Sequence, residues 1–231
     1  MQNKTLVFDT GPIISLAMNN LLWLLKPLKE KFNGEFYITE AVKKECVEKP
    51  LSGKKFKFEA LQVLKLIQDG IIKVYDNEKL RTDSLYLLEK ANYLFKVHNN
   101  YVRIVQYAEI ESVMAAKILN AEAVVIDEFI TRTLLEDAFS VGDRLNKKLH
   151  LKVDADKQHI MKFKEEVAGI NVIRSVELVT VAYEMGFFKE YYLKVPNPKR
   201  ILLEALLWGV KLNGCSVSEN EIEETIKIEK V

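Results

Sequence analysis

The stretch of residues 4–16 constrains the fold most, because an apolar run of strand-forming residues ends there abruptly on a carboxylate. Residues 6–8 favour a short buried strand, and Asp9 follows it directly. Thr10 is a preferred helix N-cap and Pro12 is tolerated in a first turn, so a helix is expected next. The pattern predicts a strand that delivers Asp9 to its carboxyl end, where open α/β sheets bind ligands. Taken alone, it fits equally well with Asp9 serving only as a helix cap.

Strand-like and helix-like segments alternate along the rest of the chain. Strands are expected at residues 6–8, 36–39, 71–75, 123–126 and 170–173. Helices are expected at residues 13–17, 41–46 (closed by Pro50), 58–67, 84–97, 101–118, 130–135, 176–185, 198–213 and 218–226. This alternation predicts an α/β fold, a three-layer α/β/α sandwich with a central parallel sheet of about five strands and additional C-terminal helices.

We divide the chain into a core with the acidic positions (residues 1–140), an insertion (141–167) and a closing segment (168–231) that completes the same domain. The insertion breaks the alternation and carries more Lys and Arg than Asp and Glu, so we expect it on the surface. A charge run of this kind could hold a phosphate backbone, but it is usually just solvated. The last two helices could imitate a helix-turn-helix DNA reader, yet the first is apolar enough to suit docking onto the body instead.

Composition restricts the classes of function. The formal net charge is +1, so nothing global indicates an acidic or nucleic-acid partner, and such binding must come from local patches or a metal ion. Cys46 and Cys215 lie far apart without metal-ligand spacing, which favours a reducing compartment over a disulfide scaffold. We see neither signal-peptide blocks nor an apolar run near the ~20 residues of a membrane span. A cytoplasmic protein without a membrane partner is expected.

Four acidic residues are predicted to meet at one edge of the sheet. Asp9 and Asp127 each follow a strand, and parallel strands end at the same edge. Glu45 and Glu111 lie on helices that would start from that edge. Carboxylates held close together repel one another, so some stay protonated or a cation neutralises them. Oxygen ligands without His or Cys suit Mg²⁺ or Mn²⁺, ions that serve phosphate chemistry.

The order and setting of these acids resemble the PIN domain, a metal-dependent nuclease fold of prokaryotic toxin–antitoxin ribonucleases and RNA-processing enzymes. The matching segments are residues 7–16, 38–45, 108–116 and 125–132. Residues 172–179 and 206–226 are similar to the end of an archaeal and bacterial PIN subgroup of largely uncharacterised members. The resemblance covers most of the chain except residues 141–167.

The resemblance implies a set of catalytic, metal-binding acids: Asp9, Glu45, Glu111 and Asp127. It also implies that Thr10 and Ser15 support Asp9, and that Glu109 is an extra acid of the subgroup. In that subgroup a Gly-Glu pair is usual, and Ala108 replaces the glycine here.

Two of the implied residues leave a choice open. Residues two apart on a helix face different ways, so Glu109 and Glu111 cannot both aim straight at one ion. The spacing to the following Met-Ala-Ala favours Glu111. Arg132 could contact a phosphate or could equally pair with Glu136 on its own helix. Glu128 is expected on a solvated face.

The leading hypothesis is a Mg²⁺- or Mn²⁺-dependent endoribonuclease that hydrolyses RNA phosphodiester bonds with metal-activated water. From the resemblance alone, an antitoxin or other protein partner and a homodimer are expected. The alternative is a non-catalytic PIN-like module that binds RNA or a protein, supported by Glu111 where many relatives have Asp and by the missing glycine before Glu109. A nucleotide-binding enzyme is disfavoured because the glycine-rich phosphate loops are absent from the sequence, and a phosphatase because Gly11 stands where its second Asp is expected.

Overall fold

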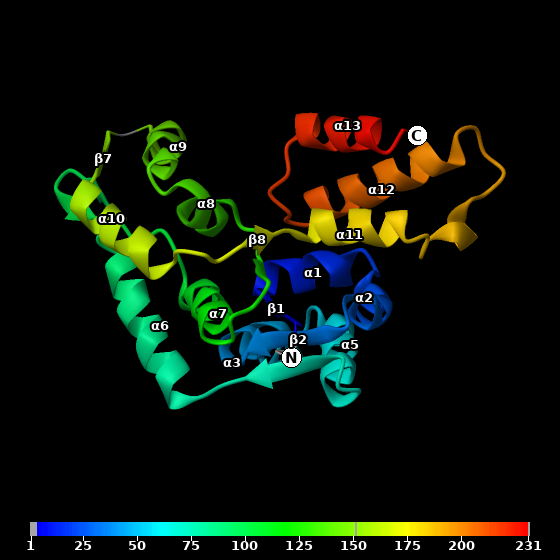
Figure 1. Cartoon of the computed structure of the whole chain (residues 1–231), viewed down its shortest axis with the longest axis horizontal. Coiled ribbons are helices and arrows are strands. Elements are labelled where there is room, and N and C mark those ends of the chain that lie inside the picture. The colour runs from blue at the N-terminus through cyan, green and yellow to red at the C-terminus, as the bar shows by residue number, and fades with distance from the viewer. Residues whose placement is uncertain (1–3, 151, 231) are drawn as a thin grey trace.

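The structure, a computed structural model, describes residues 4–150 and 152–230. Within these residues, a five-stranded sheet lies at the centre of the protein (Figure 1). Its strands are β1 (Lys4–Phe8), β2 (Gly34–Thr39), β3 (Ile72–Tyr75), β6 (Ala123–Val125) and β8 (Val172–Ile173), in the order β3-β2-β1-β6-β8. All neighbouring strands are parallel. The expected sheet is confirmed, and β1 is its central strand, so Asp9 lies in the middle of the carboxyl edge.

Alternate side chains of the strands feed two apolar cores, as the two-residue period of a strand requires. Leu6 and Phe8 pack in the first core, and Val7 packs in the second. The first core is covered by α1 (Thr10–Met18), α2 (Leu25–Phe32), α5 (Lys57–Gln68), α11 (Ser175–Glu184), α12 (Pro198–Leu212) and α13 (Glu219–Ile228). The second is covered by α6 (Glu78–Ala91), α7 (Tyr107–Ile118), α8 (Phe129–Asp137), α9 (Ser140–Leu149) and α10 (Lys157–Glu166). The three-layer α/β/α sandwich is therefore confirmed.

The helix expected at residues 84–97 ends earlier than predicted. Helix α6 stops at Ala91, and β4 (Phe95–Val97) follows, pairing antiparallel with β5 (Asn100–Tyr101) and β7 (Val153–Ala155). His98 and Asn99 both have positive φ, which makes the tight turn between β4 and β5. Phe95 is fully buried in the second core, and that burial favours the strand over a continued helix. Helix α7 consequently begins at Tyr107 rather than near residue 101.

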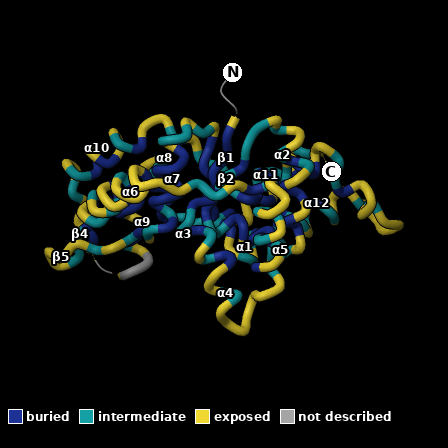
Figure 2. Tube along the Cα trace, turned by 90° about the horizontal axis from the view of Figure 1, so that it is seen from below, coloured by how far each residue is buried: buried dark blue, intermediate teal, exposed yellow. Residues whose placement is uncertain are grey.

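The helix after β2 does not close at Pro50. It runs as α3 (Glu40–Lys43), a π-helical turn (Lys44–Glu48) and α4 (Lys49–Ser52). Pro50 is the second residue of α4 and follows the π-helical turn directly. Figure 2 shows α4 and the exposed segment after it projecting from the body. Glu45 therefore lies inside a π-helical turn, a distortion that occurs frequently at functional sites.

The segment of residues 141–167 is only partly on the surface. It contains most of α9, β7 and α10, and it buries Val141, Ile160 and Phe163 in the second core. The spacing of Ile160 and Phe163 on one helical face explains this burial.

The C-terminal helices dock onto the body rather than standing free as a helix-turn-helix reader. Leu203, Leu207 and Val210 of α12 are fully buried in the first core. Short 3₁₀ helices at Leu22–Leu24 and Lys189–Tyr191 complete the chain. No helix in the described part of the chain is both long and apolar enough to cross a lipid bilayer.

Candidate active site at the carboxyl edge of the sheet

Asp9 is a buried helix cap with one oxygen left over. Its Oδ2 accepts a hydrogen bond from the Gly11 N–H at 3.4 Å, whereas its Oδ1 is buried and has no hydrogen-bond partner among the described residues. Burial raises the pKa of Asp9 to about 7, and the charges of Glu109 and Glu45 also raise it, against the backbone N–H groups of Thr10 and Gly11. A buried polar atom without a partner is unusual in a native protein and calls for an explanation.

Glu45 approaches Asp9 from the π-helical turn. Its Oε2 accepts a hydrogen bond from Thr10 Oγ1 at 2.8 Å, and its Oε1 lies 3.5 Å from Lys49 Nζ. The hydroxyl of Thr10 thus contacts Glu45, and not Asp9 as expected, because Thr10 is already the first residue of α1. The neighbouring Cys46 is buried, and burial together with the charges of Asp9 and Glu45 raises its pKa to about 12.

Glu109 approaches Asp9 from the first turn of α7. Its Oε2 accepts hydrogen bonds from Thr131 Oγ1 at 2.6 Å and from the Gln106 N–H at 3.1 Å. Burial raises the pKa of Glu109, and the charges of Glu128 and Glu45 add to that effect. We call Asp9, Glu45 and Glu109 the acid cluster, because each of these acids acts electrostatically on another of the three.

Glu111, two residues further along α7, faces elsewhere. Its Oε2 accepts a hydrogen bond from the Ala41 N–H at 3.0 Å, and its Oε1 accepts one from the Tyr107 hydroxyl at 2.8 Å. The side chain is 2% exposed, and both oxygens are occupied. Glu111 therefore joins the start of α3 to α7, whereas Glu109 faces Asp9; the choice made from spacing had favoured Glu111.

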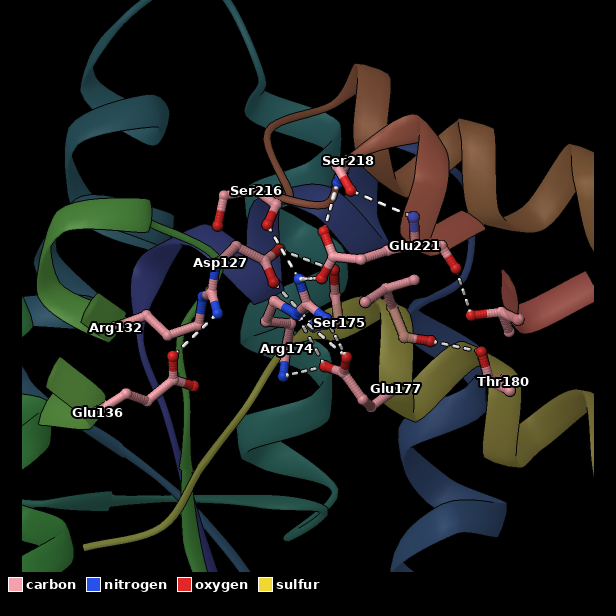
Figure 3. Close-up of polar contacts among 12 residues, drawn as sticks. Asp127, Arg132, Glu136, Arg174, Ser175, Glu177, Thr180, Ser216, Ser218 and Glu221 are labelled. Atoms are coloured by element: carbon pink, nitrogen blue, oxygen red, sulfur yellow. Dashed lines mark hydrogen bonds and ion pairs between the residues drawn. The ribbon is translucent and has the colours of Figure 1, made fainter. Parts of the chain in front are cut away.

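Asp127 follows β6 at the same edge of the sheet as Asp9, and it has hydrogen-bond partners of its own. Figure 3 shows Asp127 beside Ser175. Its Oδ2 accepts hydrogen bonds from Ser15 Oγ and Ser175 Oγ, and its Oδ1 accepts one from the Ser175 N–H, all at 2.7 Å. The Ser216 N–H donates to its backbone carbonyl at 3.0 Å. Ser15 therefore supports Asp127 rather than Asp9, because it lies further along α1 and faces the start of α11.

Gly11 separates the two aspartates. A Cβ at this position would lie 3.3 Å from the Asp127 Cβ and 3.8 Å from the Asp9 Oδ2. The two strand-ending aspartates are thus neighbours across one glycine, as the parallel sheet predicts. Their carboxylates nevertheless differ, since every oxygen of Asp127 accepts a hydrogen bond and Asp9 keeps one without.

Beside Asp127, Arg174 makes charged contacts that the sequence did not predict. Arg174 donates to Glu177, to Glu221 Oε1 at 2.8 Å and to the Ser216 carbonyl at 3.0 Å, tying the starts of α11 and α13 together (Figure 3). Ser218 and Glu221 form a capping box at the start of α13. These contacts fix the segment that leads into α13 against the edge of the sheet.

Arg132 and Glu128 belong to α8 and its N-cap, which follow Asp127 directly in the chain. Arg132 Nη1 lies 3.0 Å from Glu136 Oε2 on the same helix, so of the two alternatives the structure shows the ion pair (Figure 3). Glu128 is the N-cap of α8 and accepts a hydrogen bond from the Thr131 N–H at 2.6 Å. It is half-buried rather than simply solvated, and its charge acts on Glu109.

The acid cluster offers ligands of the kind that a hard divalent metal ion prefers. Its donors are carboxylate oxygens, which suit Mg²⁺ and Mn²⁺, and the unpartnered Oδ1 of Asp9 is an oxygen that a cation would satisfy. In the conformation described, no three Asp, Glu, His or Cys side chains of residues 4–150 and 152–230 come close enough together to hold one ion. The chemistry of the donors therefore fits a hard divalent ion, and the side chains would have to draw closer around it.

Comparison with known families gives one match. A family model described as a PIN domain (DUF3368) matches residues 5–138. Those residues include the acid cluster, Glu111, Asp127 and Glu128. Neither the curated proteins nor the solved structures gave a match.

Proposed function

The chain belongs to the PIN-domain family, whose members are generally nucleases, and from this premise we propose that it is a divalent-metal-dependent endoribonuclease hydrolysing RNA phosphodiester bonds. The observation that carries the proposal is the buried Oδ1 of Asp9. It has no hydrogen-bond partner among the residues that the structure describes, and the charges of Glu109 and Glu45 act on the same carboxyl. Carboxylates held this close repel one another, and a bound cation would reduce that repulsion.

In this proposal Asp9, Glu45 and Glu109 hold Mg²⁺ or Mn²⁺. When bound, the ion supplies a water of lowered pKa and neutralises charge on the phosphodiester. Thr10 orients Glu45 through its hydroxyl, and Thr131 orients Glu109. The resemblance to the family had implied Glu111 and Asp127 as ligands; we propose instead that both act as positioning residues, because their oxygens are already occupied by donors of the protein.

Asp9→Asn tests the proposal directly. The wild-type protein is expected to cleave single-stranded RNA when millimolar Mn²⁺ is present and to stop when EDTA is added. Asp9→Asn keeps the shape of the side chain but loses its charge, so kcat/KM should fall at least ~100-fold. Gel analysis of a labelled RNA measures both effects.

The matched control is Asp69→Asn. Asp69 ends α5 just before β3 begins, so it lies at the amino edge of the sheet, away from the acid cluster. This variant should cleave like the wild type. Undiminished cleavage by Asp9→Asn would remove the mechanism.

Glu109→Gln and Glu111→Gln distinguish the two candidate ligands on α7. Glu109→Gln should weaken Mn²⁺ binding about 10-fold or more, since a ligand carboxylate is lost. Glu111→Gln should leave the Mn²⁺ affinity within about 3-fold and instead lower stability, because it weakens the cap of α3. Calorimetric titration with Mn²⁺ and thermal melting without metal measure the two effects, and the reverse pattern would assign the ligand role to Glu111.

A second candidate function is a PIN-like module that binds RNA without cutting it. The observation in its favour is that no three acidic, His or Cys side chains within the described residues stand close enough to share an ion. The calorimetric titration separates the candidates: a heat of Mn²⁺ binding that Mg²⁺ competes away supports the nuclease, and no heat supports the binding module.

A further inference from the structure

A cavity of about 650 Å³ opens between the start of α8 and the face of α9. Glu128 and Phe129 line it from α8, and Asp143, Arg144 and Lys147 line it from α9. The volume falls within the range of pockets that bind small ligands. Helix α9 lies beyond the residues that match the family model, so the pocket is formed jointly by the matched region and by a segment outside it.

The pocket adjoins the acid cluster through a single residue. The Thr131 N–H donates to Glu128 Oε2, which lines the pocket, and the Thr131 Oγ1 donates to Glu109 Oε2, both at 2.6 Å. One threonine thus contacts both a wall of the pocket and an acid of the cluster. An RNA strand that lies over the acid cluster can therefore place a neighbouring nucleotide in the pocket.

Two exposed cationic side chains, Arg144 and Lys147, line one side of the pocket. The Arg144 guanidinium carbon lies 3.5 Å from the centre of the Phe129 ring, so the guanidinium rests on the ring. Arg144 is exposed, and no ion pair with it or with Lys147 is found in the described part of the chain. Lys147 lies three residues along α9 and so on the same side of the helix. By contrast, the nearby Arg132 is already paired with Glu136.

We propose that this pocket is a nucleotide subsite for single-stranded RNA, in which Arg144 stacks on a base and Lys147 contacts the adjoining phosphate. The inference deepens the proposed function and rests on it, since it places the nucleotide next to the phosphodiester that lies at the acid cluster. Bases stack on guanidinium planes and on aromatic rings without demanding a sequence. The carboxylates of Glu128 and Asp143 can accept hydrogen bonds from base amino groups or from the ribose 2′-hydroxyl.

The test uses the full chain with a fluorescently labelled single-stranded RNA. In the wild-type background, Arg144→Glu is expected to raise KM for cleavage about 10-fold or more and to change kcat little. In the Asp9→Asn background, which does not cleave, Arg144→Glu and Lys147→Glu should each weaken RNA binding. Lys147→Glu removes the phosphate contact, so it should also lower the slope of log K against log salt concentration by about 0.7 or more. Arg144→Lys keeps the charge and loses the stacked plane, so its defect should largely vanish when the RNA is abasic at the stacked position.

The matched control is Arg200→Glu. Arg200 is an exposed residue near the start of α12, paired with Glu204 on a helix that covers the other core, and the substitution makes the same change of charge. It should alter KM by less than about 3-fold. A melting temperature equal to that of the wild type shows that each variant folds.

The outcomes separate the two claims. If the wild type cleaves RNA and Arg144→Glu cleaves it with the same KM, the subsite proposal is overturned and the nuclease proposal stands. RNA binding that Arg144→Glu weakens, in a protein that never cleaves with Mn²⁺, supports the subsite and overturns the nuclease. If Arg144→Glu and Arg200→Glu change KM equally, the effect comes from the overall charge of the protein, and the subsite proposal is overturned.

Discussion

Replacing Asp127 with alanine is expected to lower the free energy of unfolding by about 3–5 kcal/mol. The carboxylate is 1% exposed and accepts three hydrogen bonds, two from Ser175 and one from Ser15. Without it, the Ser175 N–H and hydroxyl are buried with no acceptor, and each unsatisfied donor costs about 1–3 kcal/mol. Ser15 loses less, because its hydroxyl also lies 3.2 Å from the Asn213 carbonyl. Urea unfolding at neutral pH measures the change.

The comparison variants for Asp127 are Asp69→Ala and Ser175→Ala. Asp69 is a partly exposed end-of-helix residue, so its replacement should change stability by no more than about 0.5 kcal/mol. Ser175→Ala removes one of the three donors and keeps the backbone N–H, so its loss should be about 1–2 kcal/mol. If Asp127→Ala unfolds like the wild type but no longer binds Mn²⁺, Asp127 is a metal ligand and not the structural anchor described here.

Asp9→Asn is expected to stabilise the metal-free protein at pH 8, by on the order of 2–4 kcal/mol. Burial raises the pKa of Asp9 from 3.8 to about 7, so the folded state holds the proton more tightly than the unfolded state. Below pH 4 the carboxyl is protonated in both states and carries no penalty. As the pH rises from about 4 to about 7, the unfolded state loses the proton first, and the stability of the wild type falls. Above pH 7 the penalty is complete, and asparagine does not incur it.

Urea unfolding in EDTA across pH 4–8 measures this effect for the wild type and for Asp9→Asn. The difference between the two proteins should grow with pH up to about 7 and then stay constant. Mn²⁺ should raise the stability of the wild type and not that of the variant, because a ligand stabilises the state that binds it. If the difference in the free energy of unfolding between the two proteins does not vary with pH, the pKa of Asp9 is not raised in the folded state.

The sequence predicts the sheet and its edge well, and the contacts of individual acids poorly. Strands that end on Asp9 and Asp127 are local patterns with a period of two, and the parallel order brings them together. The partners of Asp127 come from residues 15 and 175, far away in the chain, and nothing local announces them. The local pattern places Phe95 in a helix, whereas it lies in β4. Its burial depends on packing against other elements, which the local pattern does not contain.

Glu109 and Glu111 differ in where they lie along α7. At the start of α7, Glu109 accepts a hydrogen bond from the Gln106 N–H, which is one half of a capping box. A residue in such a box lies in the first turn, near the edge of the sheet, whereas Glu111 is turned away by its position in the helix. The first-turn position of Glu109 brings it to the edge of the sheet, whereas the spacing to Met-Ala-Ala favours Glu111.

The network around Asp127 also bears on how far this protein can be shortened. The family match ends at residue 138, yet β8, Ser175 and Ser216, which cover β6 and Asp127, come later in the chain. A fragment cut after the matched region would leave β6 as an open edge strand and the first core without α11 and α12. Bare strand edges of this kind recruit other strands and lead to aggregation. We therefore expect a fragment of residues 1–138 to fold poorly without the strand and helices that follow it.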